Sequence, residues 1–182
     1  NAAGCDSTHT LFATINYSNT DSSSITACDS TIWNGQTIDT SGTYIQTFTN
    51  AAGCDSTHTL NVTMNYTPTA DAGIDATICC DTSYIVTGTS TNDSSVIWTT
   101  LGDGYFAWPN QNNTRYFPGP NDCDSGYVTL IFTAYGYSPC GSVSDTMILT
   151  IDSLTTGNSS ITACDIFNWN GQTIDTSGTY IQ

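Results

Sequence analysis

Asn50-Ala-Ala-Gly-Cys-Asp-Ser-Thr-His-Thr-Leu60 decides the architecture of this chain, because residues 1–11 carry the same letters at an offset of 49. A second repetition has an offset of 136, at which residues 23–46 return as residues 159–182 with three changes. Repetition at fixed offsets is the sequence signature of arrays of small structural modules. We therefore expect part of a tandem array and not one globular domain.

The offsets predict four parts within one period of that array. Thr47-Phe-Thr49 precedes Asn50, and the same three residues placed after Gln182 would lead back to Asn1. The chain is therefore expected to be one period, about 185 residues long, of a longer array. The expected parts are the C-terminal part of a short β module (residues 1–17), a complete short module (18–66), a larger module (67–152) and the N-terminal part of the next short module (153–182).

Composition and charge exclude several classes of function. Only 9% of the 182 residues are charged, all sixteen acids are Asp, and Arg115 is the single strong base. Since a net charge of -15 repels phosphate, we expect no nucleic acid and no anionic lipid surface as a partner. Direct membrane insertion is not expected either, because no long apolar run is present.

Residue patterns predict an all-β fold. Thr, Tyr, Val and Ile favour strands, and Asn-Gly and Ser-Gly pairs favour turns between them. Leu60, Val62 and Met64 alternate with polar residues, which is the period of a half-buried strand. In the larger module, short strand-like runs separated by turns indicate an antiparallel β-sandwich of immunoglobulin-like type. Those runs are residues 84–89, 95–100, 127–135 and 145–151.

The eight cysteines indicate disulfide bonds formed in an oxidising compartment. A module of about fifty residues buries little core and is expected to need a staple. Cys28 and Cys54 are the only cysteines of the complete short module, so we predict that they pair. Their repeat counterparts, Cys164 and Cys5, are predicted to bond to partners in neighbouring repeats. Alternatively, the tail of one subunit would complete the head of the next by strand addition.

The larger module contains four further cysteines. We favour a bond between Cys79 and Cys140, because it would link an early strand to a late one, and a bond between Cys80 and Cys123. The exchanged pairing of the two adjacent cysteines stays open. The small and larger modules are thus both expected to be stapled by disulfides.

Two blocks of sequence resemble known repeats. Ser-Ile-Thr-Ala-Cys-Asp, Trp-Asn-Gly and Thr-Ser-Gly-Thr-Tyr in the short module resemble repeats of giant secreted surface proteins of Bacteroidota. Ala70-Asp-Ala-Gly73, Ile97-Trp-Thr-Thr100 and Gly102-Asp-Gly104 in the larger module resemble the PKD-like, immunoglobulin-fold repeats of those proteins. Together they resemble type IX-secreted adhesins of the gliding-motility, SprB-like kind. Cys80 and Cys123 depart from that family's pattern, and their joint presence supports pairing them with each other.

The resemblance implies export through the type IX system and a long filament at the extracellular cell surface. It also implies O-glycosylation, which in such proteins occurs at Asp-Ser or Asp-Thr followed by an apolar residue or Thr. The same motif has an ordinary structural reading, as turn and strand-start chemistry. The candidate sites are Ser7, Ser30, Ser56, Thr146 and Ser153.

Two groups of residues contain side chains suited to metal binding or catalysis. Asp122 and Asp124 offer oxygens at alternate positions, and with Asp103 they would supply part of a calcium site. The alternative is the ordinary use of Asp in turns. Asp55-Ser-Thr-His58 holds the residue types of a catalytic triad, but neighbours on a strand point to alternating faces. We therefore expect no enzymatic activity and no cofactor apart from a possible calcium ion.

The resulting prediction is a structural repeat segment of an extracellular bacterial surface filament or adhesin, used in surface attachment or gliding motility. Its expected partners are neighbouring repeats or subunits of the same filament, with the substratum or surface glycans as possible ligands. One alternative is a carbohydrate-binding accessory array of a secreted hydrolase, for which Trp33, Tyr44 and their counterparts Trp169 and Tyr180 would form a binding platform. As repeat equivalents, these aromatic residues are instead expected to form the core of the short module. Another is a self-assembling fibre subunit completed by its neighbour's strand.

Overall fold

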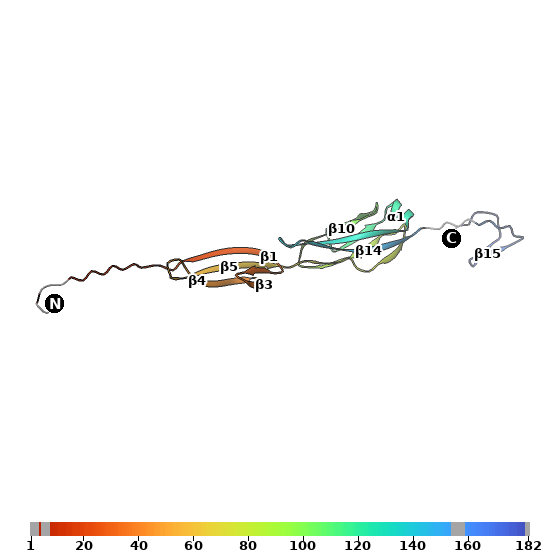
Figure 1. The fold of residues 1–182 in the computed structure, drawn as a ribbon. Coiled ribbons are helices and arrows are strands. Elements are labelled where there is room, and N and C mark those ends of the chain that lie inside the picture. Colours follow the sequence, from red (N-terminus) through yellow and green to blue (C-terminus); the bar gives the residue numbers. More distant parts are fainter. Residues whose placement is uncertain (1–3, 5–7, 154–158, 181–182) are drawn as a thin grey trace.

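The computed structural model describes residue 4, residues 8–153 and residues 159–180. The protein is all-β: these residues form sixteen strands and one short helix. Figure 1 shows an extended row, with a separate N-terminal segment, a small β unit, a larger sandwich and a C-terminal hairpin. The helix found in the described part of the chain is too short to cross a membrane.

The small unit is built around one central strand. Its elements are β1 (Thr20–Cys28), β2 (Thr31–Trp33), β3 (Gln36–Ile38), β4 (Gly42–Thr49) and β5 (Asp55–Asn65). In its three-stranded sheet β5 lies between β1, to which it is parallel, and β4, to which it is antiparallel. The alternation seen in the sequence has the expected result, because Leu60, Val62 and Met64 are all buried on one face of β5.

The β2–β3 hairpin completes the small unit's core. Its turn, Asn34-Gly35, has φ values of 50° and 80°, as a two-residue hairpin turn of the Asn-Gly kind requires. Ile38 at the end of the hairpin is only 2% exposed and joins the core of β5, against which Trp33 and Tyr44 also pack. The two aromatic residues considered for a carbohydrate platform therefore contribute to packing.

The sandwich follows β5 directly. Its sheets have the orders β10-β13-β14-β7 and β11-β12-β8, and β6 and β9 form a separate pair. Alternate residues of β13 and β14 point into one core, where Trp98 and Phe132 lie with ring centroids 4.9 Å apart. This arrangement is an immunoglobulin-like β-sandwich. Its elements are β6 (Thr69–Asp71), β7 (Ala76–Cys79), β8 (Tyr84–Thr87), β9 (Thr89–Thr91), β10 (Asp93–Thr100), β11 (Tyr105–Phe106), β12 (Asn113–Phe117), α1 (Pro120–Ser125), β13 (Tyr127–Gly136) and β14 (Ser142–Asp152).

In each unit the last long strand is parallel to a strand from the beginning of that unit. In the small unit, β1 and β5 are parallel over their whole paired length, from Thr20 opposite Thr57 to Cys28 opposite Asn65. In the sandwich, β7 is parallel to β14. An antiparallel sandwich was expected for the larger module, and the parallel pairing of β7 with β14 differs from that expectation. The consequence of the two parallel pairs is that each unit is entered at one end and left at the other.

The C-terminal hairpin repeats part of the small unit. It consists of β15 (Phe167–Trp169) and β16 (Gln172–Ile174), which pair with each other in the register of β2 and β3. In the described residues these two strands form a sheet of their own, without a third strand.

Candidate functional site

The most distinctive feature of the molecule is a disulfide at the joint between the small unit and the sandwich. Cys28, the last residue of β1, bonds to Cys140, which precedes β14; their Cα atoms are 5.2 Å apart and 112 residues separate them in sequence. Neither cysteine has the partner predicted from the sequence. A bond expected within each unit is replaced by one bond between the units.

Strand direction explains why Cys28 does not pair with Cys54. Because β1 is parallel to β5, Cys28 lies opposite Asn65 at the end of β5. Cys54 precedes the start of that strand, so the two cysteines are separated by about 35 Å at roughly 3.3 Å per residue. A disulfide requires Cα atoms within about 7 Å. Cys54 is therefore unpaired and half-buried.

The same argument excludes Cys79 as the partner of Cys140. Cys79 ends β7 and lies opposite Asp152 at the far end of β14, whereas Cys140 precedes the start of β14. Cys79 is exposed and unpaired. Its neighbour Cys80 bonds to Cys123 on α1, with Cα atoms 5.4 Å apart, which is the second pair that the sequence favoured.

Hydrogen bonds hold the joint beside the disulfide. The carboxylate of Asp29 accepts from the backbone N–H of Thr67 at 2.9 Å and from its hydroxyl at 2.5 Å. The amide of Asn65 donates to the carbonyl of Ser138 at 2.8 Å, and that of Asn92 donates to the carbonyl of Thr67 at 3.3 Å. The hydrogen bonds from Thr67, led by that of its hydroxyl, lower the pKa of Asp29. Thr67, in the short linker between β5 and β6, is therefore hydrogen-bonded both to the small unit, through Asp29, and to the sandwich, through Asn92.

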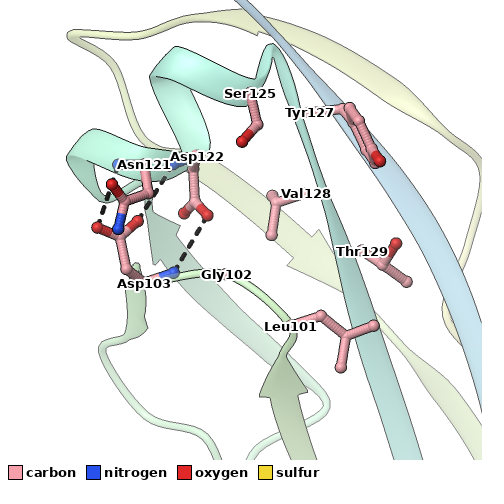
Figure 2. A pocket seen from close by; sticks show the side chains of 9 residues that line it. All are labelled: Leu101, Gly102, Asp103, Asn121, Asp122, Ser125, Tyr127, Val128 and Thr129. Atoms are coloured by element: carbon pink, nitrogen blue, oxygen red, sulfur yellow. Dashed lines mark hydrogen bonds between the residues drawn. The ribbon is translucent and has the colours of Figure 1, made fainter.

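A second site lies at the far end of the sandwich, where α1 meets the β10–β11 loop (Figure 2). The carboxylate of Asp122, only 2% exposed, accepts hydrogen bonds from four donors: the N–H groups of Asp103, Gly104 and Gly119, and the hydroxyl of Tyr116 at 2.6 Å. Burial, together with this hydrogen bond, raises the pKa of Tyr116. The carboxylate is thus satisfied by neutral donors.

Asp103 in the loop in turn accepts hydrogen bonds from the backbone of α1. Its carboxylate accepts from the backbone N–H groups of Asn121 and Asp122, each at 3.1 Å, so the loop and the helix are bound in both directions. A Cβ atom at Gly102 would collide with the carboxylate of Asp122, and one at Gly104 would collide with the ring of Tyr116. The Gly-Asp-Gly motif is therefore required by the close approach of the loop to these side chains.

The calcium prediction is not supported by this geometry. Asp122 and Asp103 lie together, but Asp124 is exposed, and the described residues contain no group of three His, Cys, Asp or Glu side chains able to hold a metal. A hollow of about 370 Å³ adjoins Asp103 and Asp122, yet four protein donors already occupy the oxygens of Asp122. The arrangement fastens a loop to a helix.

The predicted glycosylation sites differ in access. Ser30, Thr146 and Ser153 are exposed, and Ser7 lies outside the described residues. Ser56 is only 1% exposed, and its hydroxyl accepts from the side-chain amide of Asn50 at 3.0 Å. Because its oxygen is buried in a hydrogen-bonded corner, Ser56 is not accessible for modification while the protein is folded as described.

The remaining cysteine predictions concern the ends of the chain. Cys164 is exposed and unpaired, while Cys5 lies outside the described residues. A further hollow, of about 360 Å³, lies in the small unit and is lined by Trp33, Asn34, Gln46, Phe48 and His58.

Comparison with known proteins does not assign the chain to a family. No protein-family model matches it, and no curated protein matches it significantly. Similar solved structures include a variant of the SrpA adhesin from Streptococcus sanguinis, at 15% identity and a TM-score of 0.33, covering 54% of this chain. They also include an I-band fragment of titin, at 15% identity and a TM-score of 0.34, covering 62% of this chain. The chain spans 66% and 42% of the lengths of these two structures.

Proposed function

We propose that this chain is a force-transmitting structural segment of an extracellular, repeat-built surface filament or adhesin, and that it is not an enzyme. The observation that carries the proposal is the disulfide between Cys28 and Cys140. It changes which parts of the chain bear a pull applied at the two ends.

Without this bond, the terminal strands would bear the load through hydrogen bonds. The pull would enter the small unit at the start of β1 and leave at the end of β5, and these strands are parallel. It would enter the sandwich through β6, pass to β7 and leave at the end of β14, and β7 and β14 are again a parallel pair. In both units the ladder would be loaded in shear, with its bonds strained together.

With the bond, a covalent route bypasses both ladders. Force passes along β1 to Cys28, through the disulfide to Cys140, and out along β14. The residues between the two cysteines are not part of this load-bearing path and bear no tension. The 112-residue separation corresponds to about 370 to 400 Å of chain that cannot be drawn out while the bond is intact.

Composition supports an extracellular location for such a segment. Disulfides persist in oxidising compartments and are rare in reducing ones. A chain with a net charge of -15 and one strong base resists collapse onto itself and onto acidic surfaces. The resemblance of its repeats to Bacteroidota surface proteins supports the finer proposal of a type IX-secreted, SprB-like adhesin acting in attachment or gliding. Its partners would be neighbouring repeats, with the substratum or its glycans as ligand.

Single-molecule stretching of the whole chain tests the proposed force route. The oxidised protein should show no lengthening from residues between Cys28 and Cys140. In the double variant Cys28→Ser, Cys140→Ser, the Cys80–Cys123 bond still closes 43 residues, which subtracted from 112 leave 69. About 230 to 250 Å of new length is then expected at roughly 3.3 to 3.6 Å per residue. Cys79→Ser is the matched control and should behave as the oxidised wild type; equal lengthening of wild type and double variant would refute the route.

The hollow beside Trp33 favours a second candidate function, carbohydrate binding. It combines aromatic rings with the side-chain amides of Asn34 and Gln46, a combination suited to the faces and hydroxyls of sugars. Saturable binding of an oligosaccharide that is lost in Gln46→Ala and kept in Ile45→Ala would support it. Absence of saturable binding across a glycan array would reject it.

A further inference from the structure

The C-terminal segment, residues 159–180, repeats the hairpin and the turns of the small unit, whereas residues 159–164 and 178–180 do not form the strands that their counterparts form in β1 and β4. Its turn residues Asn170 and Gly171 have φ values of 48° and 82°, matching 50° and 80° at their counterparts in the β2–β3 hairpin. Asp165, with φ of 65°, matches Asp29 with φ of 60°. The hydroxyl of Tyr180 donates to the carbonyl of Thr176 at 2.8 Å, as the hydroxyl of Tyr44 does to that of Thr40 at 2.9 Å.

Within the described residues this segment is not paired with a counterpart of the central strand β5. In the small unit Ala27 and Ile38 are buried beneath β5, whereas their counterparts Ala163 and Ile174 are exposed and half-buried. Among the described residues, no strand other than β15 and β16 pairs with this segment. It therefore presents the apolar side chains that β5 would cover.

A strand of the required kind is found at the other end of the chain. Residues 11–16, Leu-Phe-Ala-Thr-Ile-Asn, are the repeat counterparts of residues 60–65 of β5. The positions that face the core in β5 are occupied here by Leu11, Ala13 and Ile15. Leu11 is 81% exposed and Ile15 is 71% exposed, and Figure 1 shows the chain ahead of the small unit as an extended segment.

We propose that residues 11–16 of one copy of this chain complete residues 159–180 of a second copy by strand addition. The two segments lie at opposite ends of the extended molecule, so one copy does not bring its own together (Figure 1). The register is fixed by the small unit. Cys28 opposite Asn65 becomes Cys164 opposite Asn16, and Tyr44 opposite Leu60 becomes Tyr180 opposite Leu11. A contact of this head-to-tail kind continues from copy to copy.

The same register predicts a covalent bond across the contact. At the joint described above, Asn65 donates to the carbonyl of Ser138, and the cysteine two residues further on, Cys140, bonds to Cys28. At the N-terminal edge of the small unit, Asn16 donates to the carbonyl of Ala52 at 2.8 Å.

Two residues beyond Ala52 lies Cys54, which is unpaired. Asn16 therefore stands in the same relation to Cys54 as Asn65 does to Cys140. Since Cys164 is placed opposite Asn16 by strand addition, it arrives beside Cys54 of the donor copy. We infer that these two cysteines form the disulfide that joins the copies.

The bond requires an oxidant of the disulfide class, for which oxidised glutathione serves. The thiolate of one cysteine attacks the glutathione disulfide, forming a mixed disulfide and releasing one glutathione thiolate. The thiolate of the other cysteine then displaces the second glutathione. One S–S bond forms between Cys54 and Cys164, one S–S bond of the oxidant breaks, and two thiols of glutathione carry away the two electrons and two protons.

This inference deepens the proposed function, since it continues the covalent route from one copy to the next. The two are nevertheless tested separately. The force route through Cys28–Cys140 is tested by stretching single molecules, whereas the contact between copies is tested by the formation of linked oligomers. Failure of either experiment leaves the other result unchanged.

The test uses the full 182-residue chain with Cys5 and Cys79 replaced by Ser, incubated with oxidised glutathione. A ladder at multiples of the 19.3 kDa chain is expected in non-reducing electrophoresis, with a Cys54–Cys164 linked peptide in its digest. Cys54→Ser and Cys164→Ser should each abolish the ladder, and an equal mixture of these two variants should stop at a dimer. A monomer, or a ladder linked through other cysteines, would overturn the proposal.

A matched pair of variants tests the strand itself. Ile15→Asp places a charge on the face that enters the partner's core and should reduce the yield of linked product at least tenfold. Phe12→Asp is the control, because Phe12 corresponds to the outward-facing Asn61, and it should leave the yield within twofold although Phe12 is the more exposed apolar residue, at 93%. A larger loss from Phe12→Asp would mean non-specific apolar association and would overturn strand addition.

Discussion

The side-chain amide of Asn65 donates a hydrogen bond to the backbone carbonyl of Ser138 at 2.8 Å, which joins the last residue of β5 to the turn that carries Cys140. This bond and the disulfide fix the same corner of the sandwich on the small unit. The joint is thus defined by side chains and not by the short linker alone.

Replacing Asn65 by Ala should loosen the joint with little effect on either core. The bond is exposed, so we expect a loss of about 0.5 to 1 kcal/mol in the free energy of unfolding. Urea denaturation measures it. Asn110→Ala is the control, since Asn110 is exposed and should change stability by less than about 0.5 kcal/mol. Equal effects of the two substitutions would show that the Asn65 bond does not contribute.

Removing the joint disulfide should cost much more. In the loop-entropy account, and with the Cys80–Cys123 bond intact, Cys28→Ser with Cys140→Ser should lower the free energy of unfolding by about 4 kcal/mol. Thermal and urea unfolding would both report the loss. Cys79→Ser should leave stability nearly unchanged because its side chain is exposed and unpaired. An unchanged free energy of unfolding in the double variant would show that the Cys28–Cys140 bond does not stabilise the folded protein.

Asp122 should be the most sensitive carboxylate of the sandwich. Asp122→Ala leaves the N–H groups of Asp103, Gly104 and Gly119 without their acceptor. We expect a loss of about 3 kcal/mol or more, since unsatisfied buried donors cost about 1 to 3 kcal/mol each and relaxation recovers part of this. Asp124→Ala, on the exposed side of α1, should change stability by less than about 0.5 kcal/mol. Similar losses from both would contradict the assigned roles.

The strands could be predicted from sequence where the local pattern was sufficient. The alternation of Leu60, Val62 and Met64 and the Asn34-Gly35 turn are complete signals within a few residues, and both features are found as expected. The short helix α1 was missed, although Pro120 after Gly119 is a usual helix start. Its six residues are too few to show helical periodicity.

The disulfide at the joint could not be predicted, because its cause is not local. Whether Cys28 can reach Cys54 depends on the direction of β1 relative to β5, and no residue near either cysteine reports that direction. The reciprocal binding of Asp103 and Asp122 is similar. The sequence offers both as candidate calcium ligands, but only the fold shows that their oxygens accept N–H donors and do not converge with Asp124 on a common point.

The Asp29 carboxylate should make the joint sensitive to acid. Its pKa is lowered in the folded protein by the hydroxyl and backbone donors of Thr67. Its contribution is therefore present above the ordinary Asp pKa of about 3.9 and is lost as the pH falls through the lower folded value. The amide resonance of Thr67 should shift in that acid range. Thr67→Ala, which removes the hydroxyl donor, should move the transition toward higher pH; an unchanged transition would exclude the hydroxyl as the main cause.

Any sugar on the folded protein should be found on Ser30 and not on Ser56. Both follow an Asp, but Ser30 is exposed beside the joint while Ser56 is buried and accepts hydrogen bonds from the side chain of Asn50 and the backbone of Asn19. A glycan on Ser56 would have to displace both donors and open that corner. Peptide mapping of protein from its native source measures occupancy at each serine. Substantial occupancy of Ser56 would show that modification precedes folding, because the folded corner has no room for the transfer.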